Sequence, residues 1–388
     1  MDAHAEIARA IDSYRDKVVA LSHEIHERPE LRFQEHFAAG LLSKAATELG
    51  LEVEREVGGL KTAFRAEFGA KGPAVAILAE YDALPNGHSC GHNLIAGAAL
   101  SAVAGLKSIA GKLPGRVVFL GTPAEEGGGG KIILIDQGAL RGVDAAMMAH
   151  PTDSEYCTMP ALATQHLKLT FHGHGAHAAL APWDGSSALA AVLQTFQSVD
   201  AMRLHLRDGS RIHGIITDGG QAVNIIPERA ECLFLARGKS SKYAKEMGAR
   251  VIRCAEGAAM ATGTRVEHVV EGGYKNLINN LSMAHRYAAH TEALGTKSVE
   301  APENTPTGST DMGDVSHVMP AIHPSFAISR RGEGNCHEDA FVAHADSQRG
   351  YDAMIRVAKA MAMTAYDLLA EPELLAAAKK EFGARKES

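Results

Sequence analysis

The chain has 388 residues, of which 46% are hydrophobic and 22% charged, and its formal net charge is −7 at pH 7. This length favours two domains over one, and the acidic balance argues against the basic surface that nucleic-acid binding needs. No apolar run reaches the length of a membrane span, and the N-terminus lacks the basic and apolar stretches of a signal peptide, so we expect a cytoplasmic protein without a membrane partner.

Helical spacing covers roughly the first 48 residues, where apolar side chains recur at intervals of three and four, and it predicts two helices there. Two short apolar runs, 73–82 and 115–126, predict buried strands on either side of a helix over 93–111. A helix over 131–140 and a short strand over 143–151 continue the pattern. Alternation of strands and helices predicts an α/β domain with a largely parallel sheet.

The pattern changes between residues 164 and 272. Two-residue alternation of apolar side chains surrounds two helices, near 186–203 and 240–258, and predicts a compact α+β insert with a half-exposed sheet. Helical spacing then returns over 279–294, followed by a strand over 323–329, which we assign to the first sheet, and a long helix from about 346. We therefore expect a first domain of residues 1–163 and 273–388, split by a smaller domain of residues 164–272.

Side chains of metal-ligand types follow the predicted strands of the first domain. They are Cys90 and His92 after the first strand, Glu125 and Glu126 after the second, His150 after the third, and Cys336 and His337 after the last. Because ligands bind beyond the carboxyl ends of strands in open α/β sheets, these groups are expected to converge. Together they suit zinc, manganese or a similar first-row ion. A hydrogen-bonded structural cluster is the alternative. The five cysteines include no C-x-x-C pair, which is not the pattern of a disulfide framework.

The adjacent carboxylates of Glu125 and Glu126 repel one another, and a cation would relieve that repulsion. Neighbours on an extended chain point in opposite directions, so one carboxylate can bind metal while the other acts as a general base toward an activated water. Two solvated loop glutamates are the alternative. Asp82 ends the first strand, and we expect it to hold a ligand histidine in the required tautomer. A turn-capping aspartate is the competing interpretation.

Motifs along nearly the whole chain resemble the M20 metallopeptidase family, and most closely its amidohydrolase branch of aminoacylases, auxin-conjugate hydrolases and aminobenzoyl-glutamate hydrolases. The variants "AEYDALP" and "CGHN" resemble the aminobenzoyl-glutamate hydrolase and dipeptidase-like subgroup. The motifs, in order, are "LSHEIHERPELRFQEHFAA", "AEYDALPNGHSCGHN", "GTPAEEGGGGK", "HGAHAALAPWDGSSAL", "GGQAVNIIPERAE", "GSTDMGDVSHVMPAIHP" and "CHEDAFVAHA".

The resemblance implies a catalytic α/β/α domain with two divalent metal ions, zinc or manganese above cobalt or nickel, and an inserted α+β lid domain that forms a homodimer. It implies that Glu125 is the general base. The metal ligands that it implies are Cys90 (bridging or shared), His92, Glu126, His150 and His337.

The resemblance also implies residues that contact the substrate. His177 matches a histidine that polarises the substrate carbonyl, often across a dimer, and Asn224 matches a substrate-facing position of the lid. Ser309, Thr310 and Asp311 are expected to line the pocket as polar groups, with a plain structural loop as the alternative.

The expected reaction is hydrolysis of the amide in an N-acyl or N-aroyl amino acid or a small dipeptide, by a metal-activated water. One alternative is a thiol hydrolase that uses Cys90 as its nucleophile. The other is a non-catalytic, metal-dependent binding protein on the same scaffold. The sequence leaves the identities of the acyl and amine parts open.

Overall fold

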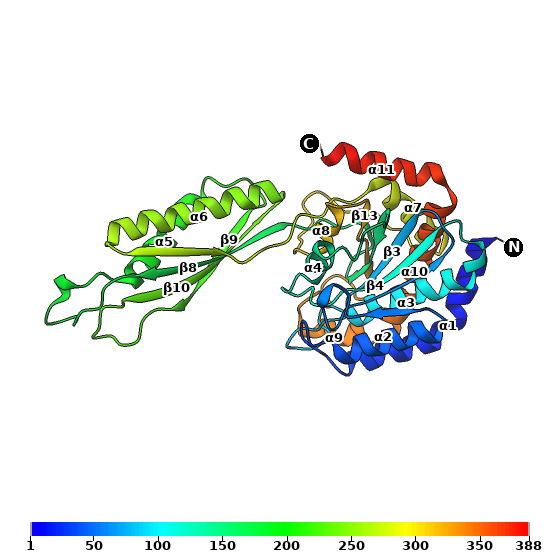
Figure 1. The fold of residues 1–388 in the computed structure, drawn as a ribbon, viewed down its shortest axis with the longest axis horizontal. Helices are drawn as coiled ribbons and strands as arrows, with labels where there is room; N and C mark the ends of the chain where they lie inside the picture. The colour runs from blue at the N-terminus through cyan, green and yellow to red at the C-terminus, as the bar shows by residue number, and fades with distance from the viewer. Residues whose placement is uncertain (1, 387–388) are drawn as a thin grey trace. The chain divides into compact units, whose positions relative to one another are not determined.

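A computed structural model describes residues 2–386 of the chain. The chain forms two compact units (Figure 1). Unit 1 comprises the described residues of Met1–Pro160, Leu277–Thr305 and Asp311–Ser388, and unit 2 comprises Ala161–Asn276 and Pro306–Thr310. The second unit is therefore inserted into the sequence of the first, as the predicted fold of a catalytic domain with an inserted smaller domain requires. The sequence-based boundary assigns 306–310 to the first domain, but this segment joins unit 2, where the Leu162 N–H donates to the Gly308 carbonyl over 2.9 Å.

A six-stranded sheet forms the centre of unit 1, in the order β1-β2-β4-β3-β5-β13. Strands β4, β3, β5 and β13 are parallel, whereas β1 and β2 are antiparallel to their neighbours. The carboxyl ends of four strands consequently meet at one edge. The strands are β1 Val53–Arg55, β2 Phe64–Gly69, β3 Ala74–Ala79, β4 Arg116–Gly121, β5 Ala145–Met147 and β13 Ala321–Ile322.

A second, small sheet in unit 1 corrects two sequence-based assignments. The segment 143–151 forms two strands, β5 in the main sheet and β6 in the small one, and 323–329 does not join the main sheet. Pro324 separates β13 from β14 and cannot donate a ladder hydrogen bond, so the chain leaves the main sheet there. The strands of the small sheet are β12 Val299–Glu300, β7 Tyr156–Thr158, β14 Ser325–Ala327 and β6 His150–Thr152.

Helices α1, α3 and α10 pack against one another in unit 1, and α3 is buried around its whole circumference (Figure 1). A β-carbon on Gly97 would lie 2.4 Å from the Met354 sulfur, so the missing side chain lets α3 and α10 pack closely. No helix among residues 2–386 is long and apolar enough to span a membrane. The helices of unit 1 are α1 Ala3–His26, α2 His36–Glu48, α3 His92–Ser108, α4 Gly130–Asp136, α7 Leu281–Ala293, α8 Met312–Ser316, α9 Asp339–Ala345, α10 Gln348–Ala370 and α11 Pro372–Lys386.

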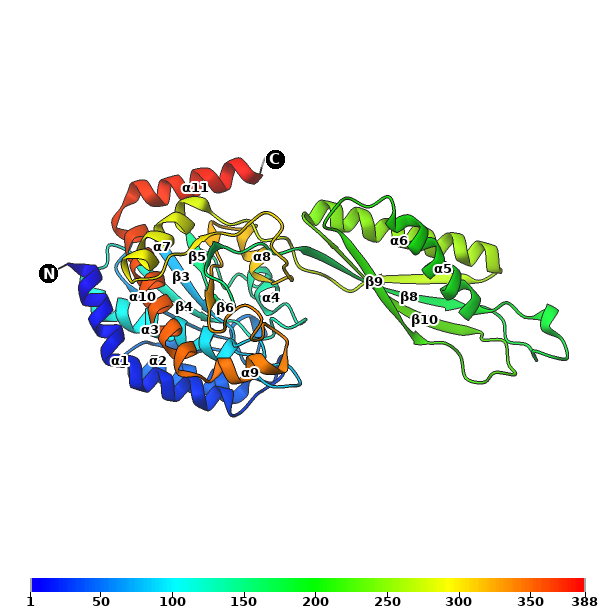
Figure 2. The ribbon, with the colours of Figure 1, turned by 180° about the vertical axis from the view of Figure 1, so that it is seen from behind.

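Unit 2 is a four-stranded antiparallel sheet, in the order β11-β8-β10-β9, with two helices on one face (Figure 2). Burial alternates along β8 and β10, as expected for a sheet that is covered on one side. The serine hydroxyls of Ser187 and Ser240 cap the two helices. The elements are β8 Ala163–His172, α5 Ala188–Arg203, β9 Arg211–Asp218, β10 Arg229–Gly238, α6 Ser241–Thr262 and β11 Arg265–Val270.

Candidate active site

Polar side chains gather where the parallel strands of unit 1 end. Glu80 and Asp82 follow β3, Glu125 and Glu126 follow β4, His150 follows β5, and His323 follows β13. Cys336 and His337 do not follow a strand of this sheet, which corrects the sequence-based assignment. They lie in the loop before α9, and the His337 N–H fixes that loop to the Cys90 segment by donating to the Ser89 carbonyl over 2.8 Å.

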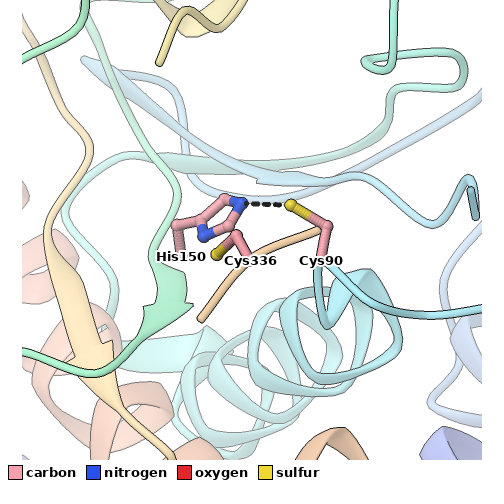
Figure 3. A group of neighbouring side chains, drawn as sticks. All are labelled: Cys90, His150 and Cys336. Atoms are coloured by element: carbon pink, nitrogen blue, oxygen red, sulfur yellow. Dashed lines mark hydrogen bonds between the residues drawn. The ribbon is translucent and has the colours of Figure 1, made fainter. Parts of the chain in front are cut away.

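Three overlapping groups of side chains have their ligand atoms within 4.8 Å of one another. Cys90, His92 and His150 each belong to two of the groups, so the three groups form one continuous cluster. Figure 3 shows the group that contains both sulfurs. The groups are Cys90, His92 and Glu126; Cys90, His150 and Cys336; and Glu80, His92 and His150.

Distances between facing ligand atoms fit a shared cation. The Cys90 Sγ lies 3.5 Å from His150 Nε2, and His337 Nε2 lies 3.3 Å from Glu126 Oε1. His92 Nε2 lies 3.3 Å from Glu80 Oε1. Ligand atoms at about 2.0–2.3 Å from one tetrahedral ion lie about 3.3–3.8 Å apart, a range that includes these values.

Three buried polar atoms in the same cluster make no hydrogen bond, although each faces another ligand atom at 3.3 Å. These atoms are Glu80 Oε1, His92 Nε2 and Glu126 Oε1. Buried polar groups in folded proteins almost always have a partner, and an unpaired buried carboxylate oxygen is costly. Each of these atoms belongs to a residue of one of the ligand groups, where bound cations would satisfy it, so the residues present fit a divalent metal centre.

Hydrogen bonds to the ring nitrogens also prepare two histidines for metal binding. His92 Nδ1 donates to Asp82 Oδ1 over 3.2 Å, and His150 Nδ1 donates to the Pro151 carbonyl over 2.8 Å. A carboxylate and a carbonyl have no proton to donate, so Nδ1 of each ring must carry the proton. Each neutral ring therefore keeps a lone pair on Nε2. The other oxygen of Asp82 accepts from the Glu126 N–H over 2.8 Å. Asp82 therefore orients one candidate ligand and the backbone of another.

Gly91 allows Cys90 and His92 to face the same cluster. Its φ is +68°, and a β-carbon there would lie 2.6 Å from the Pro151 ring. Glycine adopts this left-handed backbone without strain, and only glycine leaves room for the proline beside His150. The CGH sequence therefore needs its glycine for both backbone conformation and packing.

We expect Gly91→Ala to weaken metal binding by at least about tenfold and to destabilise the chain by about 1–2 kcal/mol, because both ligands that flank it must move. Calorimetric zinc titration and chemical unfolding would measure the two effects. Gly257→Ala is the matched control, since it lies within α6 with no atom near its β-carbon position. An unchanged zinc affinity in Gly91→Ala would contradict this account.

The turn that carries the two glutamates is held by a buried carboxyl. Ala124 has a left-handed backbone, with φ +60°, and its N–H donates to Glu35 Oε1 over 2.9 Å. Burial raises the pKa of Glu35 to about 7. Strained backbone often marks functional sites, and here it directly precedes Glu125.

Glu125 is only 6% exposed. Burial, and then the charges of Glu80 and Glu126, raise the pKa of its carboxyl well above the usual value. A carboxyl with a raised pKa, beside a metal cluster, suits proton transfer near neutral pH.

A buried network of ion pairs adjoins the cluster through Glu80. Lys131 Nζ donates to Glu80 Oε2 over 2.5 Å and to Asp311 Oδ1 over 2.7 Å. Burial opposes ionisation of Glu80, but Lys131 and then His92 outweigh it and lower its pKa to about 2. Burial raises the pKa of Asp311 to about 6, against the opposing effect of Lys131. Asp311 is thus an ion-pair partner of Lys131, whereas the sequence led us to expect that Asp311 lines the substrate pocket.

The remaining predicted site residues lie in unit 2. The Ala178 N–H donates to the Asn224 carbonyl over 3.0 Å, so the segments of His177 and Asn224 pair. Ser309 Oγ accepts from Arg237 Nη1 over 3.1 Å, and Thr310 is buried. The substrate roles of these four residues stay predictions, as do the ligand and catalytic roles in unit 1.

Sequence reasoning missed Glu80, Lys131 and His323, and it left Cys336 out of the ligand set. Glu80 had a usable signal, because residues two apart on an extended chain point to the same side, so Glu80 accompanies Asp82. His323 is fully buried, and its Nδ1 donates to the Met148 carbonyl over 3.1 Å. Its ring lies edge-on to His150, with 5.6 Å between the centroids.

A buried cluster of imidazole, thiol and carboxyl groups at the carboxyl ends of parallel strands is typical of metal-dependent hydrolases. Residues 76–360 match peptidase family M20/M25/M40. The chain is 40% identical to a mouse Xaa-Arg dipeptidase, over 97% of this chain and 91% of the relative. It is 29% identical to one of the subunits of the p-aminobenzoyl-glutamate hydrolase from Escherichia coli, over 96% of this chain and 93% of the relative.

A dinuclear metal-binding M20 peptidase from Bacillus subtilis has a similar fold, with a TM-score of 0.74 at 21% identity, covering 92% of this chain and 99% of that one. The chain belongs to peptidase family M20/M25/M40, which confirms the resemblance drawn from its motifs. It is a hydrolase that acts on C–N bonds, and its family membership supports divalent metal ions as cofactors.

Proposed function

We propose that the chain is a dipeptidase that hydrolyses the amide bond of small dipeptides and N-acyl amino acids, and that Xaa-Arg dipeptides are its best substrates. The buried ligand cluster carries the proposal that the reaction uses metal. Identity of 40% to an Xaa-Arg dipeptidase, over 97% of the chain, carries the proposal for the substrate.

The proposed centre assigns one role to each group of unit 1. Two divalent ions, held by Cys90, His92, Glu126, His150 and His337, would polarise the amide carbonyl and activate a water. Glu125 accepts the proton of that water and returns it to the leaving amine. Asp82 holds His92 and the Glu126 backbone in place. Thiol ligands favour zinc over manganese.

His177 is proposed to donate a hydrogen bond to the substrate carbonyl. Its Nδ1 accepts from the N–H groups of Ala179 and Leu180, each over 3.2 Å, so the ring proton must reside on Nε2. The side chain is exposed. An exposed Nε2–H is the donor that a developing oxyanion needs. Asn224, Ser309 and Thr310 are proposed to contact the rest of the substrate.

We expect His177→Ala to lower kcat by about 100-fold, since losing one oxyanion donor costs about 3 kcal/mol. The variant should unfold at the same denaturant concentration as the wild type. Steady-state kinetics would measure the loss. His174→Ala is the matched control, because His174 is also exposed and lies in the same HGHGAH segment. Equal losses in both variants, or none in His177→Ala, would reject the assignment.

Homodimerisation is proposed to use unit 2. Large apolar side chains are exposed in the two segments that pair near His177, with Trp183 at 78% and Leu180 at 72% exposure, and Val223 is fully exposed. Exposed apolar patches on folded proteins commonly mark interaction surfaces.

Two alternatives to a metal-dependent hydrolase are less well supported. A thiol nucleophile needs a lowered pKa, whereas the hydrogen bond with Cys336, and then burial, raise the pKa of Cys90 well above its usual value. A non-catalytic binding protein would have no use for Glu125, a buried carboxyl next to the ligand Glu126.

A substrate panel would test the proposed function. Purified chain, loaded separately with zinc, manganese, cobalt or nickel, would be assayed on Xaa-Arg, Xaa-Glu and Xaa-Leu dipeptides, N-acetyl amino acids and p-aminobenzoyl-glutamate. We expect the highest kcat/KM for Xaa-Arg dipeptides. A preference for p-aminobenzoyl-glutamate would reject Xaa-Arg dipeptides as the best substrates but leave amide hydrolysis in place. If the chain hydrolysed none of these amides, the proposal would be overturned.

A further inference from the structure

Cys336 occupies a place in the metal cluster that the five proposed ligands do not include. Its Sγ, the Sγ of Cys90 and a ring nitrogen of His150 all lie within 4.8 Å of one another (Figure 3). The three side chains come from three separate segments: the loop before α3, the start of β6 and the loop before α9. Two thiols and one imidazole meeting in this way form a ligand set that suits zinc.

Backbone contacts hold Cys336 in position. The Cys336 N–H donates to Asn335 Oδ1 over 2.8 Å, and the next N–H, of His337, donates to the Ser89 carbonyl over 2.8 Å. His337 has a left-handed backbone, with φ +73°. The loop is therefore fixed beside the Cys90 segment, with its cysteine directed into the cluster and the adjacent His337 facing Glu126.

The geometry fits one ion held by all three groups. The Cys90 Sγ lies 3.5 Å from His150 Nε2, and a tetrahedral zinc with bonds of about 2.3 Å to sulfur and 2.05 Å to nitrogen would separate such atoms by about 3.6 Å. The same bonds put two sulfurs about 3.8 Å apart, which is compatible with the 4.8 Å limit of the group. His150 keeps its Nε2 lone pair for this position, because its Nδ1 donates to the Pro151 carbonyl.

We propose that Cys336 is a metal ligand, which completes with Cys90 and His150 a thiolate-rich position selective for zinc. This inference rests on the proposed metal-dependent function. The cluster then has two unlike positions. Two sulfurs and an imidazole serve one, whereas the other has Glu126, His92 and His337 beside the shared Cys90, and its oxygen and nitrogen ligands also suit manganese.

A structural thiol is the competing explanation. Cys336 Sγ also contacts the Pro151 carbonyl at 3.4 Å, as a weak S–H donor would. A structural thiol would leave metal affinity unchanged when replaced by serine, because serine can donate to the same carbonyl. A ligand thiol would not be replaceable, since a neutral hydroxyl is a poor zinc ligand.

The test uses the full-length chain, stripped of metal and titrated with zinc, manganese and cobalt. We expect Cys336→Ser and Cys336→Ala to raise the zinc Kd by at least about tenfold, since even groups that only orient ligands are worth 10- to 100-fold in affinity. Manganese affinity should change little. The near-ultraviolet sulfur-to-cobalt charge-transfer band should lose about half its intensity, because one of two thiolates is gone. Cys254→Ser is the matched control, since Cys254 is a half-buried thiol on α6 outside the cluster.

Wild-type protein gives a second readout that needs no variant. With one equivalent of zinc bound, X-ray absorption should find two sulfur neighbours at the metal, and one sulfur would overturn the inference. Unchanged zinc affinity and cobalt band in both Cys336 variants would also overturn it, while leaving the proposed function intact. A wild-type chain that binds neither zinc nor cobalt would reject the inference and the metal-dependent function together.

Discussion

Glu125→Gln should lower kcat by about 10³- to 10⁴-fold, the upper part of the range for acid–base catalysis, because an amide cannot accept the proton of the attacking water. Metal content should stay unchanged, since Glu126 is the carboxylate in the ligand group with Cys90 and His92. Burial and the charges of Glu80 and Glu126 already oppose ionisation of Glu125, so its neutralisation should not destabilise the metal-free fold. Steady-state kinetics with elemental analysis of the same samples would measure both quantities.

Glu52→Gln is the control for this substitution, because Glu52 is an exposed glutamate in unit 1 and its charge should not affect turnover. Retained activity in Glu125→Gln would reject Glu125 as the base. Loss of metal together with loss of activity would instead assign Glu125 to the ligand set.

Lys131→Met should destabilise the metal-free chain by about 3–5 kcal/mol, because it leaves two buried carboxylates without their cation. Lys131 is fully buried, and both Glu80 and Asp311 depend on its ammonium group. The lost charge should also displace Glu80 and thereby weaken metal binding through the group that contains His92 and His150. Urea unfolding of metal-free protein and zinc titration would measure the two effects.

Lys112→Met provides the comparison for a lysine ion pair outside the core. Lys112 and Glu6 pair over 2.6 Å at the surface, and exposed pairs contribute little to stability because water and salt screen them. If the two lysine variants lost similar stability, the Glu80–Lys131–Asp311 network would not have the supporting role assigned to it.

The sequence predicted the fold class because its strongest signals are local. The segments that form β3 and β4 are continuously apolar, as expected for strands buried on both faces of a sheet. Helix α3, which lies between them in sequence, is apolar on all sides. Alternation in β8 and β10 likewise identified a one-sided sheet. The segment 323–329 also looked like a strand, but a local pattern does not specify its partner, and β14 pairs with β6 outside the main sheet.

The candidate site could be predicted only in part, for the same reason. Cys90, His92, Glu126 and His150 follow strands whose carboxyl ends meet, so a topological rule brought them together. Lys131 reaches partners that lie 51 and 180 residues away, and nothing near it in sequence indicates that its ammonium is buried between Glu80 and Asp311. Cys336 enters the cluster on a loop whose backbone bonds to Ser89, 248 residues away from His337 along the chain, and no local pattern specifies that contact.

Removing and restoring the metal, while measuring activity and metal content in the same sample, distinguishes a metal-dependent hydrolase from a thiol hydrolase. We expect a chelator to abolish hydrolysis of the best dipeptide substrate, zinc or manganese to restore it, and the recovered activity to rise in proportion to the bound metal. Full hydrolysis by metal-free protein, with loss of activity on cysteine alkylation, would contradict the metal centre and favour a Cys90 nucleophile.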